Sequence, residues 1–465
     1  MELSSLLTRY DGKSLFLPAH GRGDALPKGI RKLLRNRPGI WDLPELPGFG
    51  GPLISHGAVA DSQKILASKF GASRGWYGVN GATGLLQAAL LAVATPGNAV
   101  LMPRNVHRSL IQACILGDLT PILFDLPYIA DRGHFIPPDL FWIRRVLKRL
   151  TEEDIKKISA VVLVNPSYQG YAKNIVPLVN EFHEKGLPVI VDEAHGAHFL
   201  LGLDDLPNSG LKAGADLVVH SLHKSSLGLV QTAILWHQGN LIDPICVERS
   251  IGLLQTTSPS ALLLASCESS LLEFASNSGK RKLSWRINEA REIFQKLAQK
   301  GLPLIETQDP LKLLLHTARF GITGFQADEW MMSRGLIAEL PEPGCLTFCL
   351  GLSPNRGVVK TLRNRWEGLL SSIPKSAPLA SFFTPPFPLI TRPMISPLRA
   401  WNSTFELMSL QDSVDEISAE MICPYPPGIP MVIPGELLDK KKVNWLLQQK
   451  LLWPNQIPAK IRVVS

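Results

Sequence analysis

The hydrophobic positions between residues 58 and 225 form short continuous apolar runs that alternate with segments of helical spacing. Continuous apolar runs are typical of strands buried on both faces of a sheet. Strands are therefore predicted at 75–79, 98–102, 120–125, 159–166 and 187–193, with one more before residue 225. Helices are predicted at 58–71, 80–97, 107–118, about 137–151 and 175–186, with a short one at the start of 210–225. The alternation predicts an α/β fold whose mainly parallel sheet has helices on both faces.

The segments outside this region have other patterns and suggest further units. Residues 1–55 are rich in Pro and Gly and read as an extended N-terminal arm, followed by a large domain at 56–265. A smaller α+β domain is predicted at 266–375, because helical, basic spacing is followed by short mixed elements. The Pro-rich stretch 376–397 reads as a linker to a C-terminal domain at 398–465.

The composition is typical of a globular protein and does not favour a membrane or nucleic-acid partner. Apolar residues make up 45% and charged residues 19% of the 465-residue chain, as in an ordinary globular enzyme. No apolar run is long enough to span a bilayer and no secretory signal is evident, so we expect a cytoplasmic protein without a membrane partner. The net charge of +8 comes from scattered basic residues, which does not favour a nucleic-acid partner. The six cysteines are widely spread and are expected to be reduced thiols.

Polar residues follow several of the predicted strands. In parallel α/β sheets, ligands bind beyond the carboxyl ends of the strands. We therefore expect a site where five segments meet. These segments are Gly81–Thr83, His107, Asn165–Tyr168, Asp192–His195 and His220–Lys224.

The stretch "VDEAHGAH" (191–198) is open to three chemical interpretations. It spells a helicase DEAH box, but a phosphate-binding loop ending at Gly12-Lys13-Ser14 would need glycine where Leu7 stands. His195 and His198 could form half of a metal site, but no further ligand is evident, and no metal is expected. The third interpretation is that Asp192, at a strand end, serves a pyridoxal phosphate (PLP) enzyme.

Lys224, in "HSLHKS" (220–225), supports the PLP interpretation. A lysine at a strand end is the expected anchor for the aldehyde of PLP, and a buried carboxylate such as Asp192 keeps the pyridine nitrogen protonated. The "NGATG" turn before the helix at 84–94 could bind the phosphate, with Ser221 and His223 flanking the lysine. His107 is placed to stack on the ring.

Each of these residues also has an ordinary structural role available to it. Thr83 and His107 could simply cap helices, Asp192 could be an N-cap, and His195 could be a packed or lining histidine. The order of these residues on consecutive strand–helix units is more specific than any one of them.

With these motifs in place, the chain resembles the Orn/Lys/Arg decarboxylases of PLP fold type I, in the short form without an N-terminal wing domain. The resemblance implies an aspartate aminotransferase-like large domain and a homodimer or higher homo-oligomer with shared active sites. Nine motifs carry it. They are "LPAHGRG" (17–23), "DLPELPG" (42–48), "FGASRGWYGVNGATG" (70–84), "PRNVHRS" (103–109), "NPSYQG" (165–170), "VDEAHGAH" (191–198), "HSLHKS" (220–225), "QTTSPS" (255–260) and "PYPPGIPMVIPGE" (424–436).

The resemblance also implies roles for matched residues. Lys224, Asp192 and His107 would be catalytic, as Schiff-base lysine, partner of the pyridine nitrogen and stacking ring. Ala194 would pack on the other ring face, and Ser258 would reach the cofactor of the neighbouring subunit. Glu436 would meet the distal cation of the substrate. The remaining expected cofactor contacts are Ala82, Thr83, His195, Ser221 and His223.

The expected reaction is PLP-dependent decarboxylation of lysine, ornithine or arginine to a polyamine-type amine and CO₂. Three departures from the family pattern put substrate choice and activity in question: Pro18-Ala19-His20-Gly21-Arg22, Ala261, and Ser167 with Gln169. Two alternatives therefore stay open. One is another fold-type-I activity such as an aminotransferase, and the other is a non-catalytic PLP-binding relative.

Overall fold

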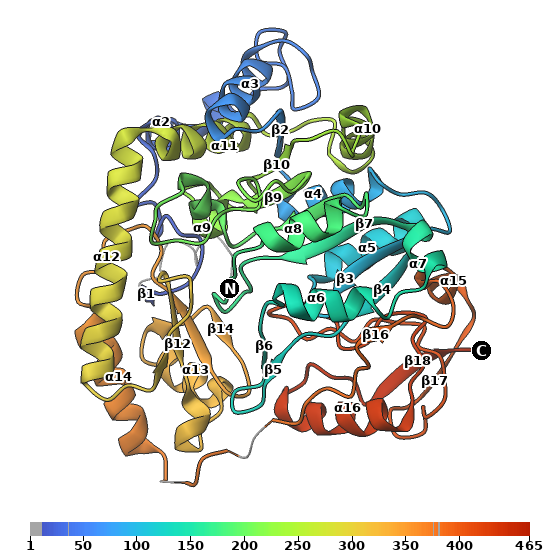
Figure 1. Ribbon diagram of the computed structural model, residues 1–465. Helices are drawn as coiled ribbons and strands as arrows, with labels where there is room; N and C mark the ends of the chain where they lie inside the picture. Colours follow the sequence, from blue (N-terminus) through green and yellow to red (C-terminus); the bar gives the residue numbers. More distant parts are fainter. Residues whose placement is uncertain (1–11, 36, 375, 380–381) are drawn as a thin grey trace.

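The computed structural model describes residues 12–35, 37–374, 376–379 and 382–465. Its centre is an eight-stranded sheet (Figure 1), in which five neighbouring strands, β4, β3, β7, β8 and β9, are parallel. The edge strand β16 and the strand β10 run antiparallel to their neighbours. In spatial order the strands are β16 (Ile390–Thr391), β4 (Thr120–Phe124), β3 (Ala99–Pro103), β7 (Ile158–Val164), β8 (Val189–Asp192), β9 (Leu217–Ser221), β10 (Ala233–His237) and β2 (Arg74–Gly78).

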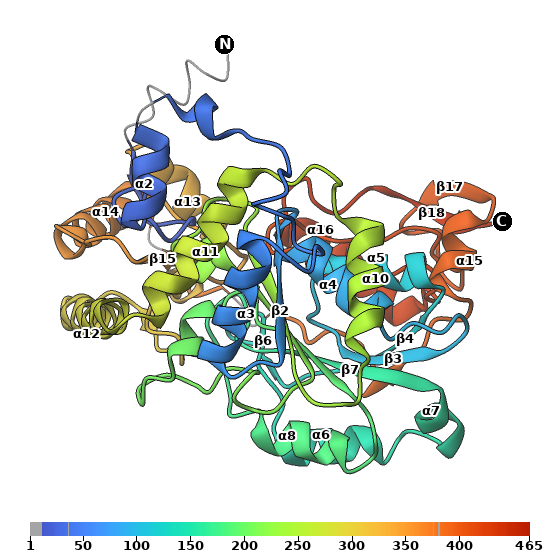
Figure 2. The same ribbon diagram turned by 90° about the horizontal axis from the view of Figure 1, so that it is seen from above.

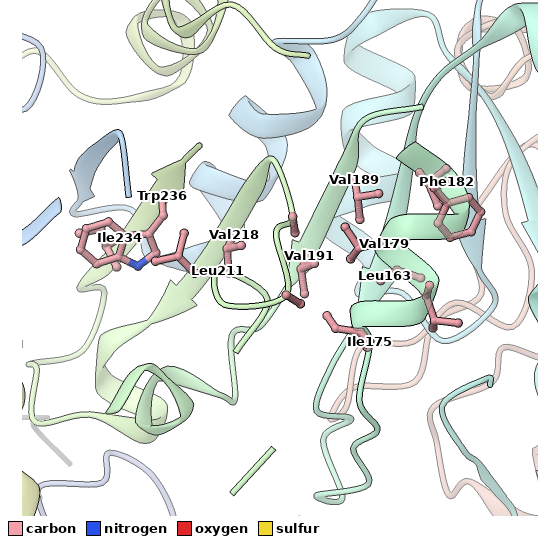
Figure 3. Packing of buried hydrophobic residues seen from close by; sticks show 14 of the residues in the cluster. Leu163, Ile175, Val179, Phe182, Val189, Val191, Leu211, Val218, Ile234 and Trp236 are labelled. Carbon is pink, nitrogen blue, oxygen red and sulfur yellow. The ribbon is translucent and has the colours of Figure 1, made fainter. Parts of the chain in front are cut away.

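Helices cover both faces of this sheet because its strands are apolar on both sides. In β8, Val189 and Val191 point into one hydrophobic cluster and Ile190 into the other. Figure 2 shows α4, α5 and α10 on one side and α6 and α8 on the other. Figure 3 shows the first cluster, where Phe182 and Val179 lie near the strand residues Val189 and Val191. The helices are α3 (Ala58–Phe70), α4 (Gly81–Leu91), α5 (Arg108–Gly117), α6 (Leu140–Leu147), α7 (Glu152–Lys157), α8 (Val176–His183), α10 (Pro244–Leu254) and α11 (Ala261–Ala275).

A second, antiparallel sheet lies beside the first and is covered by long helices. Its strand order is β11, β12, β15, β14, and β15 places Cys349 opposite Lys312. The N-terminal strand β1 pairs with β13, so the start of the described chain is anchored to this unit. The elements are β11 (Leu304–Ile305), β12 (Lys312–Leu315), β14 (Leu340–Pro341), β15 (Leu346–Cys349), β1 (Lys13–Ser14), β13 (Leu336–Ile337), α12 (Asn277–Gln299), α13 (Gly324–Met332) and α14 (Val358–Ser372).

The C-terminal residues form a third hydrophobic cluster under α16 (Lys440–Leu452). It also contains the antiparallel pair β17 (Phe405–Ser409) and β18 (Lys460–Val464), with α15 (Pro397–Asn402) nearby (Figure 1). Two smaller features matter for the site: the hairpin of β5 (Tyr128–Ile129) with β6 (His134–Phe135), and the one-turn helix α9 (Leu222–Ser225).

The predicted elements of the large domain are confirmed with one exception, and with differences at their ends. Gly71 ends α3 with φ +80°, a conformation that glycine adopts without strain. The predicted short helix near residue 210 is wrong: residues 210–214 form turns, and the strand begins at Leu217. The predicted linker contains β16, which pairs with β4, and the predicted arm contains α2 (Lys28–Arg35) and a 3-10 turn at Pro38–Trp41. Residues 1–11 of the arm lie outside the described residues, and the domain boundaries stay predictions.

In the part of the chain that the structure describes, no helix is both long enough and apolar enough to cross a membrane.

Candidate active site

The five polar segments that follow predicted strands do meet at one edge of the large sheet. They line a cavity of about 320 Å³ that also touches the β5–β6 hairpin and residues 424–431. Strand register explains the meeting, because Asp192 at the end of β8 lies opposite Val164 of β7 and Val219 of β9. The predicted site residues that line the cavity are Ala82, Thr83, His107, Asp192, Ala194, His195, Ser221, His223 and Lys224.

Lys224 lies in α9, directly after strand β9, with its side chain in the cavity. Its Nζ is 3.1 Å from Nε2 of His195 and 5.7 Å from the ring centroid of Tyr168. Burial lowers the pKa of Lys224; the charges of Asp192 and Glu339 act in the opposite direction, and Lys312 lowers it further. A lowered pKa increases the fraction of neutral amine, the form that attacks an aldehyde.

Asp192 is buried at the carboxyl end of β8, and its Oδ1 accepts a hydrogen bond from the backbone N–H of Ala194, 3.1 Å away. Burial raises the pKa of Asp192, although this hydrogen bond and the charge of Lys224 oppose the rise. When burial has raised the pKa of a carboxylate, a cation that lies close to it stabilises the charged form. The protonated pyridine nitrogen of PLP is such a cation.

His107 caps α5, since its Nδ1 accepts from the backbone N–H of Ser109 at 3.3 Å. Burial lowers the pKa of His107 to about 4, with Lys224 and Arg108 contributing, so the ring is neutral and suited to stacking. The segment 424–428 supports it: Gly428 accepts from the backbone N–H of Arg108 at 2.9 Å. A Cβ at Gly428 would lie only 3.2 Å from the imidazole. His107 therefore both caps α5 and lines the cavity.

The start of α4 suits a phosphate. The eleven-residue helix begins without a side-chain cap, at Gly81, which adopts φ +67°. Gly81 donates its own N–H to the carbonyl oxygen of Gln231 at 2.8 Å, so the N–H groups of the residues that follow it are the ones suited to an anion. Thr83 is exposed and lines the cavity, and Ser221 Oγ lies 3.1 Å from His223 Nδ1. A partly buried lysine, a buried carboxylate, a neutral histidine and a helix start without a side-chain cap together fit PLP.

The other polar residues of the stretch 191–198 contact neighbouring side chains and backbone. Glu193 is fully buried, and it accepts from Gly210 N–H at 3.0 Å and lies 2.7 Å from His220 Nε2. His198 Nε2 lies 3.1 Å from Asp309 Oδ1, while His195 faces Lys224. The two histidines therefore have separate partners, and no described group of three or more His, Cys, Asp or Glu side chains could hold a metal ion.

Several side chains at the site were given no role from the sequence. The ring of Tyr168 packs against His195 at a tilt of 49°, with centroids 4.3 Å apart, and its hydroxyl donates to Glu339 Oε1 at 2.6 Å. A buried lysine, Lys312, has its Nζ 3.5 Å from His195 Nδ1 and 3.0 Å from Cys349 Sγ. Only Tyr168 carried a signal in the sequence, because it follows a strand in "NPSYQG".

The N-terminal arm reaches this region as well. Ala19 donates its backbone N–H to the carbonyl oxygen of His223 at 2.9 Å, and Leu17 donates to Glu339 Oε2 at 2.8 Å. Ala19 belongs to the stretch 18–22 that departs from the family pattern, and it is bound here through its backbone rather than its side chain. That contact can be made by any residue except proline.

Two predicted residues do not line the cavity of this chain. Ser258 is exposed, with its Oγ 3.2 Å from Thr256 Oγ1. Glu436 is fully buried and is bonded by the Arg104 guanidinium, with one Nη1–Oε2 contact of 3.2 Å. Lys442 Nζ also lies 3.3 Å from Glu436 Oε1. The roles of Ser258 and Glu436 toward cofactor and substrate stay predictions, but Glu436 has charged partners within the chain.

Comparisons with known proteins identify the family and the fold. The profile of the family described as Orn/Lys/Arg decarboxylase, major domain, matches residues 41–308, and that of the C-terminal domain of the same family matches residues 382–458. An arginine decarboxylase of Halalkalibacterium halodurans is 28% identical over 461 residues, covering 94% of this chain and 90% of the relative.

Two solved structures show the same fold. Lysine decarboxylase A from Pseudomonas aeruginosa superimposes with a TM-score of 0.76 at 16% identity, over 94% of this chain and 77% of that one. L-threonine transaldolase from Pseudomonas fluorescens, in its internal aldimine state, gives a TM-score of 0.60 at 17% identity, over 79% and 86% of the two chains. The predicted fold type I architecture and the predicted cofactor are confirmed. The chain belongs to the Orn/Lys/Arg decarboxylase family of PLP enzymes.

Proposed function

We propose that this protein decarboxylates a basic L-amino acid to the polyamine-type amine and CO₂, with arginine preferred over lysine and ornithine. The observation that carries the proposal is the cavity in which the amine of Lys224, the carboxylate of Asp192 and the ring of His107 meet. Preference for arginine is supported by the arginine decarboxylase that matches this chain over nearly its whole length.

PLP supplies the electron sink that accepts the electron pair released when CO₂ leaves. Lys224 would anchor the cofactor through its amine. Asp192 would stabilise a positive charge on the pyridine nitrogen, and His107 and Ala194 would lie against the ring. The start of α4, with Thr83 and Ser221, would hold the phosphate.

Lys224 and His195 are also suited to hold the proton that moves during turnover. Their nitrogens lie 3.1 Å apart, and burial, together with Lys224 and Lys312, keeps the pKa of His195 well below its usual value. A neutral imidazole accepts a hydrogen bond from the Lys224 ammonium, which keeps that proton inside the cavity.

We also propose a homodimer in which Ser258 serves the cofactor of the partner. Support comes from its position: the "TTSPS" segment is exposed and lies outside the cavity of its own chain. Lys224→Ala and Ser258→Arg proteins should each lose activity, whereas mixed dimers contain one intact site. Activity regained on mixing the two variants supports sharing, and no regain, or sedimentation as a monomer, contradicts it.

The decisive test measures CO₂ release by purified holoenzyme from arginine, lysine and ornithine in parallel, together with assays for keto acids. CO₂ with the corresponding amine supports the proposal, keto acids point to an aminotransferase, and neither product points to a non-catalytic relative. Borohydride should fix PLP on the peptide containing Lys224. Fixation on another lysine would contradict its role.

A further inference from the structure

A carboxylate not used by the mechanism, that of Glu342, faces the same cavity. Its side chain is 7% exposed, and it lies just before strand β15, next to the β5–β6 hairpin. Oε1 accepts a hydrogen bond from Gln169 Nε2 at 2.8 Å. Oε2 lies 3.2 Å from His134 Nε2, which is an ion pair only when the imidazole is protonated, and neither of these two buried atoms makes a hydrogen bond. A buried carboxylate oxygen that lacks a hydrogen bond is costly unless a ligand supplies one.

Two consecutive residues, Tyr168 and Gln169, connect the surroundings of Lys224 with Glu342. Tyr168 lies beside both Lys224 and His195, and the next residue, Gln169, holds Glu342. A substrate whose amine takes the place of the lysine amine can therefore extend its side chain along Tyr168 toward Glu342. Gln169 is one of the departures from the family pattern, and it is the residue that orients this carboxylate.

Aromatic rings surround the same part of the cavity. Tyr128 and Phe135 of the hairpin meet edge to face, with centroids 5.4 Å apart, and Phe382 lies against Gly133. All three rings line the cavity. Ring faces attract cations and cover methylene groups, which matches a basic side chain with an apolar stem.

A comparison of the acidic side chains near the cavity also favours Glu342 as the partner of a cation. Among the described side chains that line the cavity, the acidic ones are Asp192 and Glu342, and Asp192 serves the cofactor. Glu436 does not line the cavity and already binds Arg104 and Lys442. The nearby cation Arg132 is neutralised by Asp131, whose Oδ1 and Oδ2 accept from its Nε and Nη2 at 2.6 and 3.1 Å. His134 is held by Tyr171, with Nδ1 3.3 Å from the hydroxyl.

We infer that Glu342, held by Gln169, binds the distal cation of the amino-acid substrate. The inference rests on the proposed decarboxylation and names the group that selects its substrate. Glu436 then has a structural role, as the counter-charge that fixes Arg104 at the wall of the cavity.

The test compares Glu342→Gln with wild type on arginine and on citrulline, which has nearly the same shape without the charge. Replacing a charge-assisted hydrogen bond by a neutral one should lower kcat/KM for arginine by about ten- to a hundredfold. The value for citrulline should change little, so discrimination between the two falls. Glu342→Asp, which keeps the charge, should retain more discrimination than Glu342→Gln. The PLP absorbance should be the same in all three proteins.

A binding measurement separates this inference from the proposed reaction. Calorimetry on the holoenzyme should show that agmatine and cadaverine bind wild type more tightly than Glu342→Gln, whereas butylamine binds both equally. If wild type releases no CO₂ but this difference is found, the reaction is wrong and the cation site stands. If wild type and Glu342→Gln discriminate equally between arginine and citrulline, and bind agmatine and cadaverine with equal affinity, the inference is overturned.

Discussion

Replacement of Glu436 by glutamine should destabilise the fold rather than merely weaken substrate binding. Glu436 is fully buried, and its partners Arg104 and Lys442 have side chains only 1% and 5% exposed. Its Oε2 also accepts from the backbone N–H of Ile433 at 3.0 Å. Glutamine keeps the shape and some of these hydrogen bonds but removes the negative charge, leaving two buried cations without a counter-charge.

The size of the effect follows from burial. Removing one partner of a buried ion pair costs about 3–5 kcal/mol, because the remaining charge is left unpaired in a medium of low polarity. A matched control in the same unit is Glu420→Gln. Its partner Arg462 is 52% exposed, and such surface pairs contribute about 0–1 kcal/mol.

The pH dependence gives a second check. Burial alone would raise the pKa of Glu436, but Arg104 and Lys442 outweigh burial and hold the pKa below its ordinary value of 4.5. A carboxylate with a depressed folded-state pKa stabilises the fold above its ordinary pKa and loses this effect as pH falls through the lowered value. The stability gap between wild type and Glu436→Gln should therefore be full at neutral pH and shrink in acid, as the pH falls below the ordinary pKa of 4.5 and through the lowered value.

Urea unfolding of the holoenzyme, wild type beside both variants, measures the effect. A Glu436→Gln midpoint as close to wild type as that of Glu420→Gln would refute the ion-pair argument. If stability were unchanged while kcat/KM for arginine fell strongly, Glu436 would be the residue that binds the distal cation of the substrate, as the family resemblance implies.

Three further predictions concern the cofactor. Asp192→Asn should keep the fold but lower kcat at least a hundredfold, which is about 3 kcal/mol in the activation free energy, because the pyridine nitrogen loses its counter-charge. A kcat near that of wild type in steady-state assays would show that another residue stabilises this charge. Lys312→Met should raise the pKa of Lys224, since a nearby cation is removed; PLP rebinding to the apoprotein, followed by absorbance, should then require higher pH, and an unshifted profile would contradict the coupling. Gly428→Ala should weaken PLP binding, because the new Cβ meets His107 and the backbone is held at φ +87°, which costs about 1–3 kcal/mol; unchanged PLP affinity in equilibrium dialysis would show that this contact yields freely.

The sequence was sufficient for the large sheet and for the residues at its carboxyl edge. Asp192 ends a strand, and Lys224 and His107 lie three and four residues after one. Parallel strands bring their ends together whatever lies between them. The one-turn helix α9 was too short for periodicity to detect, so Lys224 was expected at the strand end itself.

Residues from distant parts of the chain could not be placed. Lys312 sits inside an apolar run that predicts only a strand, yet its Nζ faces His195, 117 residues earlier. Glu342, in "PEPG", has the appearance of an ordinary loop residue. Glu436 was expected near the substrate because the family resemblance implies that role, but the motif does not reveal a partner 332 residues away, such as Arg104.

Because β16 pairs with β4, the central sheet cannot be completed until the residues of β16 have been synthesised. Phe124 of β4 leaves the ribosome long before Ile390, its partner at the sheet edge. At ordinary elongation rates the interval is on the order of tens of seconds. During that time the nascent sheet presents an unpaired apolar edge, the kind of surface on which chains aggregate. The nascent chain is therefore expected to depend on chaperones until its last quarter has emerged.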